Sequence, residues 1–261
     1  MAQEGKPQRE AQSMALKVRA EAGIGQGPIA DVFGLLERLD IVYLRYPTGV
    51  EAAEGYAARK GGRRIVFTNS SYPRGKEYFT AAHELGHLYL DLAGDDLFID
   101  KCIESDPMEL AEARANYFAA NVLMPTDAVV SYIADRIGVE PDGMTAKHAV
   151  SVQQYFRVSY ASALIRLRAL GMISEMAYER AKSYGGYPTL ADLTRRCGYD
   201  SFLAQVDGGV HIPAGSLLKV VELYEYDKIP FGSLKYFTES IQTSPEALGL
   251  SPRQMEAGDE R

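Results

Sequence analysis

The segment His83-Glu84-Leu85-Gly86-His87 constrains this chain more than any other, because its spacing is typical of a metal-binding helix. Residues 76–92 are predicted to form one helix. Side chains four positions apart lie on one helix face, with Cβ atoms roughly 5–6 Å apart, so both imidazoles can reach one Zn²⁺ at about 2.0–2.1 Å. Since the chain has only 4 histidines, a chance pair is the weaker alternative. His83 and His87 are predicted metal ligands, and Glu84 is predicted to accept a proton from an attacking water.

A catalytic zinc also needs a third protein ligand and an open position. The predicted helix 108–123 offers Glu112 and, one turn earlier, Glu109. Asn116 follows Glu112 by four residues, so its amide lies on the same face and is placed to orient a ligand histidine. Glu112 is therefore the stronger candidate. A solvated helix glutamate is the alternative, because charged side chains are mostly exposed.

Composition restricts the class of protein. A chain of 261 residues with 46% apolar and 24% charged residues is typical of a globular protein of one large or two small domains. A net charge of −7 argues against general nucleic-acid binding, although a local basic face stays open. Cys102 and Cys197 are far apart and neither stands at ligand spacing, so neither is predicted to bind metal. No apolar leader or long apolar run occurs, and we expect a cytoplasmic protein.

The order of elements predicts an α+β fold. A polar lead-in, 1–12, precedes a helix at 15–22 and an amphipathic helix that begins near Pro28. A short β-type run at 41–44 and two strands at 55–59 and 64–68, joined by a turn at 60–63, predict a small antiparallel sheet that packs on the motif helix. An edge of that sheet would suit an extended peptide. Residues 91–107 are predicted to be irregular, and further helices are predicted at 108–123, 126–137 capped by Thr126, 149–156, 160–170, 190–197, 214–226 and 230–240.

Two sequence stretches resemble the ImmA/IrrE family of metallopeptidases. They are Thr80-Ala81-Ala82 followed by the motif, and Glu112-Ala113-Arg114-Ala115-Asn116-Tyr117-Phe118-Ala119-Ala120 running into Leu123-Met124-Pro125. The resemblance implies that His83, His87 and Glu112 bind the metal and that Glu84 is the general base. Many members have a second Glu where this chain has Arg114, which changes the electrostatics around the site rather than the ligand set.

The resemblance also implies a fold and a function. The expected fold is α+β, with a small thermolysin-like zinc peptidase core followed by a helical, helix-turn-helix-like region. We expect three regions: 1–143 as the peptidase domain, 144–183 as the helix-turn-helix-like part and 184–261 as a C-terminal helical part, with a linker signal at Gly185-Gly186-Tyr187-Pro188. Family members typically cleave or release a helix-turn-helix repressor encoded beside them, in mobile-element or stress regulation. The expected function is therefore a regulatory zinc-dependent endopeptidase acting on one protein partner.

The sequence is compatible with several alternatives. The ligand types also accept Mn²⁺ or another divalent metal. A non-proteolytic DNA- or protein-binding regulator with a structural or vestigial metal site is the second function class, and the intact Glu84 argues against it. The conceivable donors to an oxyanion are Tyr117, Tyr89, Tyr72 and His148.

The stretch 149–171 is either a DNA-binding or a structural helix pair. Its arginines near the second helix are Arg157, Arg166 and Arg168. The structural alternative, with Val158, Leu164, Leu167 and Leu170 facing inward, is favoured because the chain is acidic.

Overall fold

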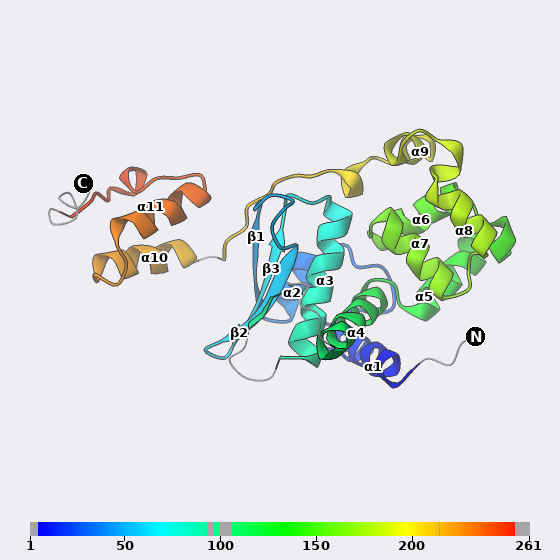
Figure 1. Cartoon of the computed structure of the whole chain (residues 1–261), viewed down its shortest axis with the longest axis horizontal. Coiled ribbons are helices and arrows are strands. Elements are labelled where there is room, and N and C mark those ends of the chain that lie inside the picture. Colours follow the sequence, from blue (N-terminus) through cyan, green and yellow to red (C-terminus); the bar gives the residue numbers. More distant parts are fainter. Residues whose placement is uncertain (1–4, 93–96, 100–105, 214, 254–261) are drawn as a thin grey trace. The chain divides into compact units, whose positions relative to one another are not determined.

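A computed structural model describes residues 5–92, 97–99, 106–213 and 215–253. The chain divides into two compact units, Met1–Gly209 and Val210–Arg261. The first unit holds the motif helix, a small sheet and most of the other helices (Figure 1). The predicted α+β class is confirmed. The division into regions at 143/144 and 183/184 stays a prediction.

The sheet has the strand order β1-β3-β2-β4. Its strands are β1 (Ile41–Tyr46), β2 (Gly55–Lys60), β3 (Arg63–Asn69) and β4 (Leu97–Ile99). Strands β2 and β3 form the predicted antiparallel hairpin, and the two glycines between them have positive φ angles. Strand β1, however, pairs with β3 in parallel, so the prediction of a wholly antiparallel sheet is wrong for this strand.

The connection 47–54 explains the parallel pairing of β1. It carries the chain past the end of β3, so β1 and β2 lie on opposite sides of that strand. Asn69, the last residue of β3, holds this connection. Its amide nitrogen donates to the carbonyls of Gly49 and Ala53, and its amide oxygen accepts from the backbone of Thr48.

Strand β4 falls in the stretch 91–107 that was expected to be irregular, and that expectation is wrong for Leu97–Ile99. It pairs with residues 56–58 of β2. Strand β4 is therefore an outer strand of the sheet, and β2 is covered over this part of its length. Residues 93–96 and 100–105, including Cys102, lie outside the described residues. Peptide binding to a sheet edge stays a prediction.

Helix α3 (Arg74–Leu90) carries the motif and is buried on nearly all sides, as expected for a helix at the centre of a domain. One charged anchor fixes it to the sheet. The buried Glu77 carboxylate accepts hydrogen bonds at 2.7 and 2.8 Å from Arg45 of β1, and one at 2.8 Å from Thr68 of β3. Because a buried carboxylate is stable only when it is paired, this triad fixes the start of α3 relative to two strands.

Helices α1 (Lys6–Glu21), α2 (Val32–Arg38) and α4 (Asp106–Leu123) surround α3. The expected polar lead-in is wrong from Lys6 onward, because Ala11, Ala15 and Val18 form a buried stripe at helical spacing. The Asp31 side chain caps α2 by accepting from the backbone of Phe33. The apolar stripe predicted for this helix is buried: Ile29, Val32, Leu35, Leu36 and Leu39.

The rest of the first unit is helical. It contains α5 (Thr126–Tyr132), a π-helical turn (Ile133–Ile137), α6 (Ala146–Phe156), α7 (Tyr160–Ala169), α8 (Glu175–Lys182) and α9 (Leu190–Arg196). The prediction of Thr126 as a cap is wrong, because Pro125 takes the cap position without a side-chain bond. Helix α8 was missed, and α9 was predicted.

The second unit contains α10 (Ser216–Glu225) and α11 (Phe231–Ser240), close to the two helices predicted there. No helix among the described residues combines the length and apolarity that a membrane span needs.

Candidate metal centre and active site

Helices α3 and α4 approach each other closely at Gly86, inside the motif. A Cβ atom at Gly86 would lie 3.1 Å from the Ala115 Cα atom and 3.1 Å from the Phe118 ring. Carbon atoms in ordinary contact are about 3.5–4.0 Å apart. Glycine at this position and alanine opposite it therefore let the two helices approach closely enough for Glu112, one turn before Ala115, to reach the histidines.

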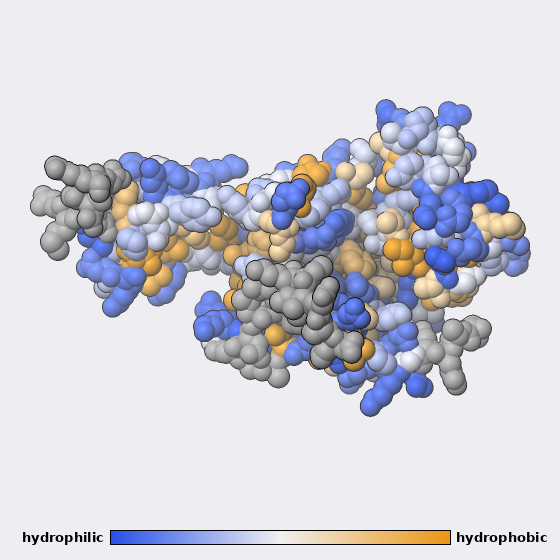
Figure 2. All heavy atoms as spheres, viewed as in Figure 1, coloured by the Kyte–Doolittle hydropathy of each residue, from blue (hydrophilic) through white to orange (hydrophobic). Residues whose placement is uncertain are grey.

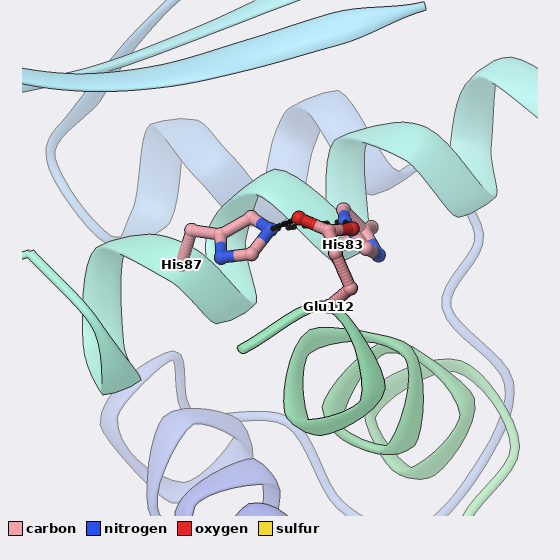
Figure 3. Close-up of side chains that lie close together, drawn as sticks. All are labelled: His83, His87 and Glu112. Atoms are coloured by element: carbon pink, nitrogen blue, oxygen red, sulfur yellow. Dashed lines mark hydrogen bonds and ion pairs between the residues drawn. The ribbon is translucent and has the colours of Figure 1, made fainter. Parts of the chain in front are cut away.

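The three predicted ligands meet at one point. Figure 3 shows the Glu112 carboxylate facing both imidazoles, with Oε2 at 3.0 Å from His83 Nε2 and Oε1 at 3.2 Å from His87 Nε2. The two Nε2 atoms are 3.0 Å apart. Ligand atoms around a tetrahedral zinc at 2.0–2.1 Å are separated by about 3.3 Å. This set of two imidazoles and one carboxylate therefore fits a divalent metal.

Each histidine is oriented by a bond on its other nitrogen. The Asn116 carboxamide oxygen lies 3.1 Å from His83 Nδ1, and the Asp91 carboxylate lies 2.8 Å from His87 Nδ1. Oxygen acceptors at Nδ1 select the tautomer whose hydrogen is on Nδ1, which leaves Nε2 free to bind a metal. The placement of Asn116 agrees with the orienting role inferred from its spacing.

Asp91 is a site residue that the sequence analysis missed. It ends α3 and stands four residues after His87, so the same i,i+4 argument that paired the histidines would have found it. Its second carboxylate oxygen accepts from Arg114, on α4. Arg114, the departure from the expected pattern, pairs with the carboxylate that orients His87.

The carboxylates around His87 favour its protonated form. Burial alone would lower the pKa of His87, but hydrogen bonds with Asp91 and Glu112 and the nearby carboxylate charges raise it to about 9. Burial would raise the pKa of Glu112, but hydrogen bonds and charges from the two histidines lower it to about 2. A metal that binds here replaces the proton on His87.

Glu84 lies beside the ligands and is fully buried. It lines a pocket of about 170 Å³ together with His83, Glu112, Asn116 and residues of α3 and the β1–β2 connection. Gly55 at the start of β2 makes room for it, because a Cβ atom there would lie 2.9 Å from Glu84 Oε1 and 2.6 Å from the Thr80 methyl group. The predicted base is thus held between α3 and the sheet, within the pocket that the metal ligands line.

The other candidates lie elsewhere. Glu109 is exposed on α4 and is not part of the ligand cluster. Tyr72 donates to the backbone of Val50, Tyr89 bonds to Arg64 and Glu21, Tyr117 accepts from Gln8, and His148 forms a capping box with Thr145. None of these four side chains lines the metal pocket, and no oxyanion donor is assigned.

The stretch 149–171 contains the predicted helix pair, and the pair packs on the core of the first unit. Val158, Leu164 and Leu167 are buried, and Leu170 is half-buried. Gly75 in the first turn of α3 touches the turn between α6 and α7, since a Cβ atom there would lie 2.9 Å from the Ser159 backbone nitrogen.

All three arginines of this stretch are engaged within the chain. Arg157 donates to the Ala30 carbonyl, and Arg168 pairs with Glu175. Arg166 is buried and donates to the Met124 carbonyl. These contacts agree with the structural alternative for the helix pair.

Helices α3 and α4, with two histidines, a third carboxylate and the buried Glu84, form a centre of the metallopeptidase type. A sequence model described as the IrrE N-terminal-like domain, a peptidase family, matches residues 36–168, which is half of the chain and includes every residue of the centre. The chain belongs to this family, and the resemblance to ImmA/IrrE peptidases is confirmed. A search of curated proteins found no match.

Proposed function

We propose that the protein is a zinc-dependent endopeptidase in which Glu84 is the general base. The observation that carries the proposal is the position of the buried Glu84 carboxylate in the same pocket as the ligands His83 and Glu112. A structural zinc site has no use for such a base and tends to close its fourth position with another Cys or His. Among the described residues, only His83, His87 and Glu112 form a metal-ligating cluster.

The chain's own residues account for the proton transfers. His83, His87 and Glu112 would hold the metal, which when bound supplies a Lewis acid that polarises the scissile carbonyl and lowers the pKa of water to about 7. Glu84 accepts a proton as the water oxygen attacks the carbonyl carbon. It then delivers that proton to the amine nitrogen as the carbon–nitrogen bond breaks.

The test compares the wild type with Glu84→Gln. The amide is nearly isosteric but cannot accept a proton, so cleavage is expected to fall by about 10²–10⁴. Metal content, measured by elemental analysis, should stay at one ion per chain. Glu112→Gln should lose the metal, whereas Glu109→Gln, a matched exposed carboxylate on the same helix, should keep it. Full cleavage by Glu84→Gln refutes the mechanism, and metal retention by Glu112→Gln removes that ligand.

We further propose that the substrate is a single regulatory protein, a helix-turn-helix repressor. Family resemblance supports this substrate class. Incubation with the repressor encoded beside the gene, with Zn²⁺ or Mn²⁺ present, should give discrete fragments by mass spectrometry and little degradation of casein. Free degradation of casein with an intact repressor contradicts the specific-regulator proposal. Binding of the repressor without any cleavage supports a non-proteolytic anti-repressor instead.

A further inference from the structure

A second cavity adjoins the metal pocket. It has a volume of about 550 Å³ and lies between α4 and α7, within the range of sites that bind small ligands. Phe79 of α3 and Asn116 of α4 line both this groove and the metal pocket. Since Asn116 also bonds the ligand His83, the groove begins beside the metal centre.

The lining of the groove is apolar. Helix α7 contributes Ala161, Ile165 and Ala169, and α4 contributes Ala113 and Ala120. Ile165 is 61% exposed, so much of its side chain is accessible from solvent. Small alanines on both helices leave the space open, and Ile165 presents an apolar surface to it. Figure 2 shows apolar surface over α7 on this face of the first unit.

The same surface of α7 is unsuited to nucleic acid. Phosphate binding requires exposed Lys or Arg side chains, and the α7 residues that line the groove are Ala161, Ser162, Ile165, Arg166 and Ala169. Arg166 is buried, with its guanidinium bonded to Met124 and Asn121. The second helix of the helix-turn-helix-like pair, α7, forms one wall of this groove instead.

We propose that this groove binds an apolar side chain of the substrate, close to the scissile bond, and that Ile165 determines this specificity. The inference rests on the proposed peptidase function. Successive residues of an extended peptide are about 3.3 Å apart. A peptide whose scissile carbonyl lies beside Glu84 and His83 therefore places a neighbouring residue at Asn116, where the groove opens. An apolar side chain in such a groove leaves water, whereas a charged one loses hydration without a partner.

The main experiment profiles cleavage of a randomised peptide library by the zinc-loaded full chain. The wild type should prefer an apolar residue at one position next to the cut. Ile165→Lys should lower kcat/KM for those peptides by about 10–200-fold and shift the preference towards Asp or Glu. The matched control is Met176→Lys on α8, where a 68% exposed apolar side chain lies outside the groove. It should leave the profile unchanged.

A second measurement does not depend on cleavage. We would record methyl NMR spectra of the zinc-loaded Glu84→Gln variant with labelled Ile and Ala methyl groups. Two probes are added in separate samples, N-acetyl-leucine amide and N-acetyl-aspartate amide. Only the leucine probe should shift the Ile165, Ala113 and Ala161 methyl signals. If the wild type cleaves peptides without an apolar preference and the leucine probe does not change the chemical shifts of these methyl groups, the groove proposal is wrong while the peptidase function stands. If the methyl signals move but no peptide or repressor is cut, the peptidase function fails.

One further outcome assigns the groove to another occupant. If light scattering shows that the wild type is a dimer, that Ile165→Lys is a monomer and that both share one cleavage profile, the groove is a self-interface. That result also overturns the proposal.

Discussion

The close approach at Gly86 makes Gly86→Ala a sharp probe of the metal centre. The added methyl group would lie 3.1 Å from both Ala115 Cα and Phe118 Cδ1. Restoring ordinary carbon contact requires a separation larger by about 0.6 Å. Because Glu112 is on the same helix as Ala115, that shift moves the third ligand away from the histidines by a similar amount. Metal sites tolerate about 0.2 Å in ligand distance, so zinc affinity should fall about 10–100-fold.

The effect of Gly86→Ala on stability should be smaller than its effect on metal binding. Overpacking of a buried contact costs about 1–3 kcal/mol. The better helix propensity of alanine offsets about 0.8–1.0 kcal/mol of this cost. The free energy of unfolding of the metal-free protein should therefore decrease by about 0–2 kcal/mol. Zinc affinity is measured by competition with a chromophoric chelator, and stability by urea unfolding with EDTA present.

Gly34→Ala is the matched control. Gly34 is also a helical glycine, in α2, but its Cβ atom would meet only the Asp31 side chain, at 3.6 Å or more. This variant should gain up to about 1 kcal/mol from helix propensity and keep wild-type zinc affinity. Unchanged zinc affinity in Gly86→Ala would refute the reasoning, because it would mean that the Glu112 side chain follows the metal regardless of helix spacing.

Three further perturbations test neighbouring parts of the site. Asp91→Asn keeps the shape but removes the charge beside His87, and zinc affinity should fall about 10–100-fold; an unchanged affinity would mean that the carboxylate does not orient the ligand. Zinc binding must remove a proton from His87, whose pKa is raised to about 9. Zinc affinity should therefore rise about tenfold per pH unit between about pH 6.5 and 8.5 and level off above that. Zinc titrations at constant ionic strength should show this slope, and an affinity that does not change with pH contradicts it. Arg166→Ala leaves the Met124 carbonyl and two side chains without their hydrogen-bond donor, so it should decrease the free energy of unfolding by about 2–4 kcal/mol. The control Arg168→Ala, at an exposed position, should decrease it by about 0.5 kcal/mol or less. Equal decreases of the two variants, measured by urea unfolding, would contradict the structural role of Arg166.

The grouping of the candidate metal ligands was predictable from sequence because it depends largely on local geometry. The histidines are one helical turn apart, and Asn116 is one turn after Glu112, so each pair shares a helix face in any fold that keeps both helices. The meeting of the two pairs was inferred by resemblance, and the structure brings them together. Gly86 inside the motif supplies the physical reason, since only a small residue permits that helix separation.

Other features depend on contacts between distant segments and were not predictable. The parallel pairing of β1 follows from the path of the connection 47–54 across the end of β3. The pattern of apolar residues in the sequence does not predict that path. The contact between Gly55 and Glu84 depends in turn on that strand order. The ion pair between Asp91 and Arg114 joins the C-terminal end of α3 to the middle of α4, and the sequence showed only that Arg114 differs from the expected pattern. The predicted first helix began too late in the chain, because the many polar residues of α1 obscured its stripe of small apolar residues, which packs on α4.

Two buried arginines, Arg19 of α1 and Arg166 of α7, bind the C-terminal end of the helix that carries Glu112. Helix α4, which carries Glu112, ends with carbonyl groups that lack helical partners. Arg19 of α1 donates to the Val122 carbonyl, and Arg166 of α7 donates to the Met124 carbonyl just beyond the helix. Both guanidinium groups also interact favourably with the negative, C-terminal end of the α4 helix dipole.

Arg166 and Ile165 are consecutive residues of α7 with different tasks. Arg166 holds the end of the ligand helix, while Ile165 lines the proposed substrate groove. A shift of α7 would therefore change the support of α4 and the shape of the groove together.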